Sequence, residues 1–144
     1  MTTARDIMHR GVKCVEANVS MVDAARMMRD MGVGALPICG EDGKLKGIIT
    51  DRDIVVKCLA EGKDPSSCNA MDLAQGKPFY VEAGADIDRV LQEMTQHKIK
   101  RIPVIENREL VGIISEADLA QHLPEDKIGS LVEAIKSGPA DHVS

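Results

Sequence analysis

VEANVSMVDAARMMRDMGVGALPI, residues 15–38, decides the fold of this chain because the chain contains a second copy of it. The second copy is VEAGADIDRVLQEMTQHKIKRIPV, residues 81–104, in which the opening Val-Glu-Ala, a central methionine and the late proline recur at matching positions. Further along the chain, GIITDRDI from Gly47 is matched by GIISEADL from Gly112. A repeat of this length predicts two similar structural units before any local pattern is considered.

Helix signals lie in the middle of each copy. In the first copy, Ser20 has the position of an N-cap and Asp23 follows at the capping-box position. Gly32 is typical of a helix end. Helical spacing predicts that the apolar face consists of Val22, Ala25, Met28 and Met31.

Short apolar runs flank this helix in both copies. One strand is expected before it, at residues 13–16 and 79–82, and two strands after it, joined by turns such as Gly40-Glu41-Asp42-Gly43. The expected hairpin strands cover residues 35–39, 45–49, 102–105 and 110–114. A second helix then follows, at residues 51–61 and 116–123. Each copy is therefore predicted to have the element order β-α-β-β-α.

The domain boundary is expected in the linker-like stretch 62–69, which contains Pro-Ser-Ser. Residues 1–65 would form the first repeat with an N-terminal lead-in. Residues 66–137 would form the second repeat with a C-terminal helix from residue 125, and residues 138–144 a loose tail. Short DIM and AMD segments precede the two copies.

The composition argues against nucleic-acid and membrane partners. The chain carries a formal net charge of -5, no Trp, one Phe and one Tyr, so it lacks the basic surface and the aromatic platforms of nucleic-acid binders. No apolar run approaches the roughly 20 residues of a membrane span, and the first residues lack the apolar stretch of a signal peptide. We expect no nucleic acid and no membrane partner. A cytoplasmic location is expected, unless export uses a route that reads no signal peptide.

Two copies with a hydrophobic-Pro-Val/Ile strand and a G-h-h-[TS]-x-x-D turn resemble a pair of cystathionine-β-synthase-type (CBS) domains over nearly the whole chain. The resemblance implies an α/β (α+β) fold in which the two repeats form one pseudo-two-fold pair. It also implies a regulatory homodimer that binds AMP, ADP, ATP or an adenosyl ligand between the repeats, in response to stress or energy state. Energy sensing of this kind needs no catalysis.

The resemblance assigns roles to four motif residues. Thr50 and Ser115 resemble the hydroxyls that contact phosphate in the family, and Asp53 and Asp118 resemble the carboxylates that grip the ribose diol. A carboxylate can accept both ribose hydroxyls, and a hydroxyl beside helix-terminal N–H groups suits an anion. The alternative is that both pairs are ordinary capping boxes, in which hydroxyl and carboxylate satisfy the helix's own N–H groups.

Basic residues distinguish the two copies. Lys100 and Arg101 lie just before Ile102, where the family often places phosphate-binding side chains, whereas the first copy has Gly34 and Ala35. We therefore expect one strong nucleotide site at most, in the second copy. The alternative is a solvated helix end, because runs of charge usually have that role.

Two histidines occur where the copies differ, so the shared scaffold does not require them. His97 replaces a methionine and His122 replaces a lysine, both toward the ends of helices that pack on the same side of the sheet in a CBS unit. They could share a zinc ion, with a third ligand from His9, His142, an acidic residue or a neighbouring subunit. Surface or helix-capping histidines are the alternative.

The four cysteines have neither C-x-x-C nor zinc-finger spacing. Cys14 and Cys39 lie in the first and second strands of copy one, which are adjacent and parallel in the CBS fold. A disulfide between them is therefore sterically plausible, and buried free thiols in a reducing compartment are the alternative.

Catalytic signatures are not found in the sequence. It contains no G-x-S-x-G, P-loop or H-E-x-x-H motif, so an enzyme is not expected. The competing hypothesis is a stress-induced interaction protein that binds no nucleotide and is stabilised by metal, a disulfide or both.

Overall fold

The computed structural model describes residues 1–74 and 78–137, which form two compact units, each with its own core. The first unit runs from Lys13 to Pro78 and contains the first copy of the repeat. The second unit joins Met1–Val12 to the chain from Phe79 onward. The expected loose tail, 138–144, lies outside the described residues.

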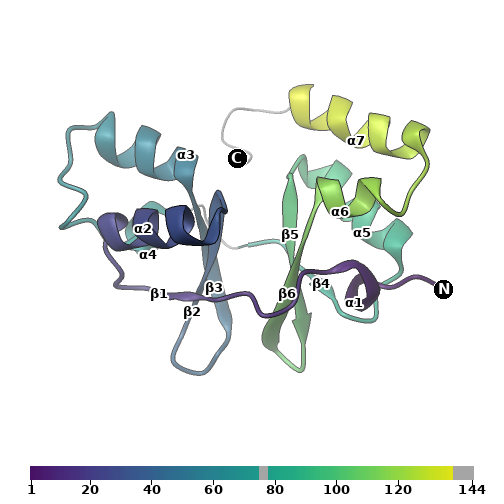
Figure 1. Cartoon of the computed structure of the whole chain (residues 1–144), viewed down its shortest axis with the longest axis horizontal. Helices are drawn as coiled ribbons and strands as arrows, with labels where there is room; N and C mark the ends of the chain where they lie inside the picture. Colours follow the sequence, from purple (N-terminus) through teal and green to yellow (C-terminus); the bar gives the residue numbers. More distant parts are fainter. Residues whose placement is uncertain (75–77, 138–144) are drawn as a thin grey trace. The chain divides into compact units, whose positions relative to one another are not determined.

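The first unit is a three-stranded sheet with helices. Its elements are β1 (Val15–Glu16), α2 (Met21–Met31), β2 (Ala35–Cys39), β3 (Leu45–Thr50), α3 (Asp51–Asp53), the π-helix η1 (Ile54–Leu59) and α4 (Ala70–Leu73). The sheet order is β1-β2-β3, with β1 parallel and β3 antiparallel to β2. The ribbons of α2 and α3 lie to the left of strands β2 and β3 in Figure 1. The predicted β-α-β-β-α order of the first copy is confirmed.

Helix α2 begins and ends as the sequence predicts, but it buries a different face. The backbone N–H of Asp23 donates to Oγ of Ser20 over 3.1 Å, and Gly32 ends the helix at a φ of 68°. The buried residues are Met21, Ala24 and Met28. The predicted face of Val22, Ala25, Met28 and Met31 is wrong at three positions, because the sheet contacts the neighbouring stripe of the same helix.

The second unit repeats this architecture and adds a helix. Its elements are α1 (Ala4–Ile7), β4 (Val81–Glu82), α5 (Ile87–His97), β5 (Arg101–Glu106), β6 (Glu109–Ser115), α6 (Glu116–Ala120) and α7 (Glu125–Ser137). The sheet order is β4-β5-β6, with the same parallel and antiparallel pairings as in the first unit. The terminal helix α7 packs against α5 and α6 (Figure 1). The expected mixed α/β class is confirmed.

The lead-in segments are exchanged between the copies. Helix α1 precedes the first copy but docks on the second, where the backbone N–H of Ala4 donates to the carbonyl of Ala85 over 2.8 Å. Helix α4 precedes the second copy but docks on the first, where the backbone N–H of Ala70 donates to the carbonyl of Val19 over 2.8 Å. The division into units therefore differs from the boundary expected between residues 65 and 66.

Gly112 in β6 makes room for the lead-in segment that docks on the second unit. A Cβ at Gly112 would lie 2.6 Å from Sδ of Met8 and 2.8 Å from the carbonyl oxygen of His9, so the lead-in backbone can approach β6 only because the side chain is missing. His9 forms an antiparallel bridge with Ile113 at this point. The approach of α1 thus brings His9 to the carboxyl end of β6.

The helix after the third strand differs from the prediction in both units. In the first unit it continues as a π-helix, and in the second it is shorter. The helix predicted over residues 51–61 consists of the short helix α3 followed by η1. At the end of η1, the N–H of Ala60 donates to the carbonyl of Val55 over 2.9 Å. The β-branched run Ile54-Val55-Val56 disfavours tight α-packing and accompanies this wider turn. In the second copy, α6 stops at Ala120 rather than Leu123, before Pro124.

Each unit buries its own apolar core. The first contains Val15, Met21, Ala24, Met28, Leu36, Ile38, Ile49, Ile54, Cys58, Ala70 and Leu73. The second contains Ala4, Ile7, Val81, Ala83, Ile87, Val90, Met94, Ile102, Val104, Ile114, Leu119 and Leu131. Both lists include residues of the lead-in helix that the unit receives, so the exchange contributes to each core. Within residues 1–74 and 78–137, no helix has both the length and the apolar character needed to cross a membrane.

Candidate functional site

Ser115 and Asp118 form a capping box at the start of α6. The backbone N–H of Asp118 donates to Oγ of Ser115 over 3.2 Å, and the backbone N–H of Ser115 donates to Oδ2 of Asp118 over 2.8 Å. The Ser115 hydroxyl also donates to Oδ2 of Asp118 over 3.0 Å. The capping role that the sequence left open is therefore realised, and it engages one oxygen of the carboxylate.

The other oxygen of Asp118 faces the lead-in. Nε2 of His9 lies 2.9 Å from Oδ1 of Asp118, with the carboxylate buried and the imidazole largely exposed. Sequence reasoning considered His9 only as a possible metal ligand. Its position beside Asp118 follows from the exchange of lead-in segments, which no local pattern signals.

Lys100 and Arg101 lie beside the same helix start. Arg101 is the register partner of Ser115 across β5 and β6, and the carbonyl of Lys100 accepts the backbone N–H of Glu116 over 2.9 Å. The side chain of Lys100 is exposed. The structure therefore brings all four predicted residues of the second copy together at one helix N-terminus, where the helix dipole and two basic residues favour an anion.

Thr50 and Asp53 form the matching box in the first unit. The N–H of Thr50 donates to Oδ2 of Asp53 over 2.9 Å, and the N–H of Asp53 donates to Oγ1 of Thr50 over 3.1 Å. Asp53 is only 2% exposed, and its Oδ1 lies 3.2 Å from Nζ of Lys57. Lys57 is a cation that sequence reasoning did not place at this site.

The first unit has no basic residue at the two positions that match Lys100 and Arg101. Ala35 is the register partner of Thr50, and the carbonyl of Gly34 accepts the N–H of Asp51 over 2.9 Å. A Cβ at Gly34 would lie 3.0 Å from Oδ2 of Asp51, so the acidic side chain fills the space beside the glycine. The first unit thus presents a carboxylate beside Gly34, where the second unit carries Lys100.

His97 and His122 belong to different local networks. Nε2 of His97 lies 3.2 Å from Oε2 of Glu93, and its ring stacks on Phe79 with 3.5 Å between centroids. Nδ1 of His122 lies 3.0 Å from the carbonyl oxygen of Asp118, which leaves Nε2 as its remaining ring nitrogen. No group of three His, Cys, Asp or Glu side chains suited to a metal occurs within the described part of the chain. A shared ion stays a prediction, and His142 lies outside the described residues.

Cys14 and Cys39 are joined by a disulfide, which is the candidate pairing that the resemblance to CBS domains made plausible. Their Cα atoms lie 5.5 Å apart, in the range that a disulfide requires. The pairing follows from the parallel register of β1 and β2, in which Glu16 lies opposite Cys39. Cys58 and Cys68 are free thiols of the same unit.

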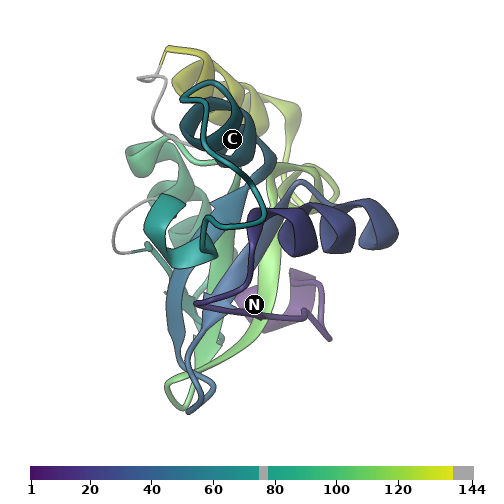
Figure 2. The same ribbon diagram turned by 90° about the vertical axis from the view of Figure 1, so that its left-hand side faces the viewer.

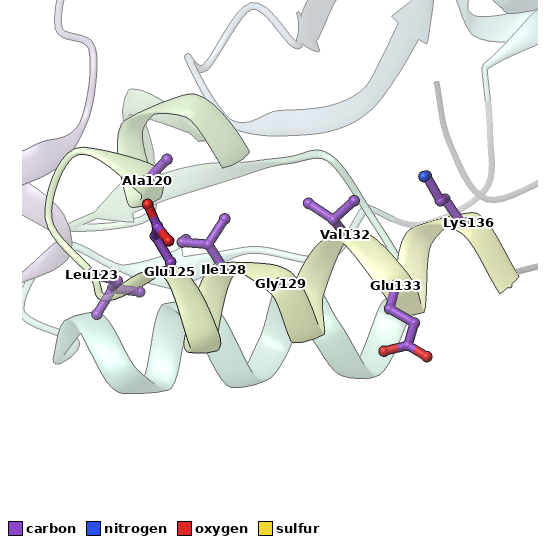
Figure 3. A pocket seen from close by; sticks show the side chains of 8 residues that line it. All are labelled: Ala120, Leu123, Glu125, Ile128, Gly129, Val132, Glu133 and Lys136. Carbon is purple, nitrogen blue, oxygen red and sulfur yellow. The ribbon is translucent and has the colours of Figure 1, made fainter.

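A groove of about 490 Å³ lies between α6 and α7 (Figure 3). Ile128 and Val132 of α7 point toward the side where Ala120 of α6 lies, whereas Glu133 points away from it. The lining residues are Ala120, Leu123, Glu125, Ile128, Gly129, Val132, Glu133 and Lys136. None of the predicted ligand residues lines this groove, so it is distinct from the helix-start cluster.

Both units have the same strand order and a [TS]-x-x-D capping box at the start of the helix after the third strand. The CBS domain model matches residues 4–59 and 70–125. The chain belongs to the CBS domain family. Both CBS matches begin at the lead-in helices, which agrees with their place in the two cores.

One similar protein is the hypoxic response protein 1 of Mycobacterium tuberculosis. It is 51% identical over 137 residues, which cover 95% of this chain and 96% of that protein. On the sequence alone, the segments MTTARDIM, GALPICG, TDRDIV and HLPE resemble this mycobacterial CBS protein, and the comparison confirms the resemblance.

Two solved CBS structures are informative about ligands. A crystal structure of Hypoxic Response Protein I with two coordinated zinc ions has a TM-score of 0.79 at 51% identity, and covers 85% of this chain and 100% of that one. The CBS domain pair of protein MJ0100, in complex with 5'-methylthioadenosine and S-adenosyl-L-methionine, has a TM-score of 0.74 at 28% identity. That match covers 84% of this chain and 94% of the MJ0100 chain.

Proposed function

We propose that this protein is a regulatory CBS pair that binds an adenine nucleotide or a related adenosyl ligand and catalyses no reaction. The cluster of Ser115, Asp118, Lys100 and Arg101 at the start of α6 carries this function. The adenosyl ligands of the MJ0100 pair support the chemical class of the ligand. A cytoplasmic role in stress or energy response is part of the same proposal, and the hypoxic response relative supports it.

Each residue of the cluster has a role that its chemistry suits. Oδ1 of Asp118 would accept the ribose hydroxyls, while Oδ2 keeps its bonds within the capping box. The side chains of Lys100 and Arg101 would neutralise phosphate near the positive end of α6. Ser115 would add a hydroxyl donor, because hydroxyls can bond to a phosphate oxygen.

We propose that the first unit binds nucleotide more weakly than the second unit, or binds none. Asp53 is nearly inaccessible and holds Lys57, and Asp51 fills the space beside Gly34. Both helix starts carry two acidic residues in their first turn, Asp51 and Asp53 in the first unit and Glu116 and Asp118 in the second. The second unit has Lys100 and Arg101 where the first has Gly34 and Ala35, and this difference favours phosphate binding at the second unit.

A homodimer is also proposed. The π-helix η1 exposes Val55 by 55%, Val56 by 42% and Leu59 by 54%, an apolar face that a second copy could cover. Light scattering should report twice the 15.6 kDa mass of the chain. A monomer at micromolar concentration would contradict the dimer.

Calorimetry with AMP, ADP, ATP and S-adenosyl-L-methionine tests the ligand proposal. Hydrogen bonds to charged groups contribute roughly 1.5–3 kcal/mol, so Asp118→Ala should weaken binding about tenfold to a hundredfold. Asp53→Ala is the matched control from the other copy and should weaken binding much less. Equal losses would contradict the asymmetry, and no heat with any of the four ligands would contradict nucleotide binding.

A second candidate function is an interaction protein that binds no nucleotide and is stabilised by metal and disulfide. The Cys14 to Cys39 bond and the zinc ions of the hypoxic response structure favour it. The donor set fits zinc in part, because Nδ1 of His122 faces a backbone carbonyl as in many metal-bound histidines. His97 and His122 would supply two ligands, and others would be needed to complete the shell.

Metal analysis separates this candidate from the first. Purified protein would contain zinc, and the His97→Ala and His122→Ala variants would each lose it. Zinc content unchanged in both variants would exclude these residues as ligands. Lower thermal stability in chelator, without any response to nucleotides, would support the second candidate.

A further inference from the structure

The lead-in segment holds the backbone of His9 against β6. The N–H of His9 donates to the carbonyl of Ile113 over 2.9 Å, and the N–H of Ile113 donates to the carbonyl of His9 over 3.2 Å. The side chain of Met8 occupies the space that a Cβ at Gly112 would need. Figure 1 and Figure 2 both show the purple helix α1 beside the green strand β6. The His9 side chain therefore starts from a fixed point next to this strand.

From this point the imidazole of His9 reaches the carboxylate of Asp118. The distance of 2.9 Å between Nε2 and Oδ1 is that of a hydrogen bond. An ionised carboxylate has no hydrogen to donate, so Nε2 is the donor. Because Oδ2 accepts from Ser115 within the capping box, His9 binds the oxygen that the box does not use. The oxygen that we propose for ribose therefore has a donor within the protein.

The two partners of this contact differ in their exposure to water. The side chain of Asp118 is 10% exposed, whereas that of His9 is 74% exposed. A buried carboxylate oxygen without a donor is unfavourable, because it has lost its hydrogen bonds to water. An exposed imidazole loses little when it turns into water, since exposed pairs are weak. His9 can thus satisfy Asp118 and can also leave it readily.

The first unit has the same arrangement with a different donor. Nζ of Lys57 lies 3.2 Å from Oδ1 of Asp53, and Oδ2 of Asp53 serves the cap. Nζ of Lys57 also donates to the carbonyl of Leu73 over 3.3 Å, and the Lys57 side chain is less exposed than that of His9, at 43%. The donor comes from η1 in one unit and from the lead-in in the other. Both boxes therefore pair the remaining carboxylate oxygen with an internal donor, and the donor of the second unit is the more exposed one.

We propose that His9 is an internal competitor that regulates the nucleotide site of the second unit. Its imidazole donates to Oδ1 of Asp118 until a ribose hydroxyl takes its place. This inference rests on the proposed nucleotide function of the same site. The competing group is a ribose with free 2'- and 3'-hydroxyls, because these are donors that can satisfy the carboxylate in place of the imidazole. The apparent affinity is lowered because Oδ1 is free in only a fraction of the molecules.

Competition has opposite effects on stability and on binding. His9→Ala removes the donor from a buried carboxylate, so this variant should unfold at a lower temperature than the wild type. The same change leaves Oδ1 of Asp118 free for ribose, so the variant should bind nucleotide more tightly. A residue that only supports the fold would lower stability without raising affinity. A residue that contacts the ligand would lower affinity when it is removed.

Calorimetry with ATP and 2',3'-dideoxyadenosine triphosphate tests the competition. The two ligands carry the same phosphates and differ only in the ribose hydroxyls, so basic residues at the site affect both equally. His9→Ala should bind ATP about threefold to tenfold more tightly than the wild type does. Its affinity for the dideoxy ligand should not change. Arg10→Ala, the matched control on the same segment, should bind both ligands as the wild type does.

A conservative variant and thermal unfolding complete the test. His9→Gln keeps an N–H donor, so its ATP affinity should return toward that of the wild type. The melting temperature should be lower for His9→Ala than for His9→Gln and Arg10→Ala, all measured on the full chain without nucleotide. Equal melting temperatures of His9→Ala and the wild type would show that the contact does not stabilise Asp118, and would overturn the proposal.

The binding outcomes separate this proposal from the nucleotide function. Equal ATP affinity in the wild type and His9→Ala, or an equal gain for both ligands, would overturn the competition and leave nucleotide binding intact. Weaker ATP binding in His9→Ala would also overturn it, because His9 would then be a ligand contact. Binding of ATP to His9→Ala but not to the wild type would support the proposal. No heat with either protein would overturn it, and the calorimetry with four ligands described above then decides whether the nucleotide function fails as well.

Discussion

Nε2 of His9 lies 2.9 Å from Oδ1 of Asp118, although the two residues belong to opposite ends of the chain. The contact exists because α1 docks on the second copy and β6 carries Gly112 where the lead-in passes. His9 thus contacts the carboxylate oxygen that we propose for ribose. An imidazole and a ribose diol would compete for that oxygen.

Replacing His9 should strengthen nucleotide binding. His9→Ala removes the competing partner of Asp118, and its largely exposed imidazole contributes only a modest interaction. We expect affinity to rise by about threefold to tenfold in calorimetry. Arg10→Ala, on the same exposed segment, should leave affinity unchanged. Weaker binding in His9→Ala would instead make His9 a ligand contact.

The capping and binding roles of Asp118 can be separated by one substitution. Asp118→Asn keeps a carbonyl oxygen that can accept the N–H of Ser115, but it removes the negative charge. Nucleotide affinity should fall about tenfold or more, whereas the cap is retained and unfolding changes by less than about 1 kcal/mol. A loss of stability equal to that of Asp118→Ala would show that the charge serves the fold instead.

Lys100 should contribute to phosphate binding through its positive charge. Its exposed side chain lies at the positive end of α6, so Lys100→Ala should weaken the binding of ATP more than that of adenosine. The salt dependence of ATP binding should also decrease, because screening acts on exposed charges. Lys44→Ala, on the hairpin of the first unit, is the control. Equal effects on ATP and adenosine would refute a role in phosphate binding.

The disulfide should stabilise the first unit. Cys14 and Cys39 are separated by 25 positions, and closing a loop of this size contributes about 2–4 kcal/mol to the free energy of unfolding. Denaturant unfolding with and without reductant would measure the difference. The Cys14→Ser, Cys39→Ser protein should show no response to reductant, and an equal response in that protein would assign the effect elsewhere.

Docking of the lead-in should weaken in acid. The backbone N–H of Thr3, followed by its hydroxyl, donates to Asp6 and lowers the pKa of this carboxyl. A depressed folded pKa means that the stabilisation is present above the ordinary Asp pKa and is lost as the pH falls through the lower value. Hydrogen exchange at Ala4 and Arg5 should therefore lose protection at low pH. Asp6→Asn should remove the pH dependence, and an unchanged acid transition would exclude Asp6 as its origin.

The sequence by itself determined the local architecture. The N-cap at Ser20, the end of α2 at Gly32 and the hairpin strands all follow from patterns within a few residues, and the structure contains them. The repeat predicted the second unit from the first, and the resemblance to CBS domains, in which these strands are adjacent and parallel, made the pairing of Cys14 with Cys39 plausible. Caps and periodicity act over one or two turns, so the sequence displays them directly.

Only the tertiary structure decided which segments meet. The packing selects which stripe of α2 is buried, docks α1 on the second copy and places His9 beside Asp118. Each of these contacts depends on how elements distant along the chain pack, and several arrangements satisfy the same local patterns. The free energy of burying the two cores selects among them, and no single segment contains that information.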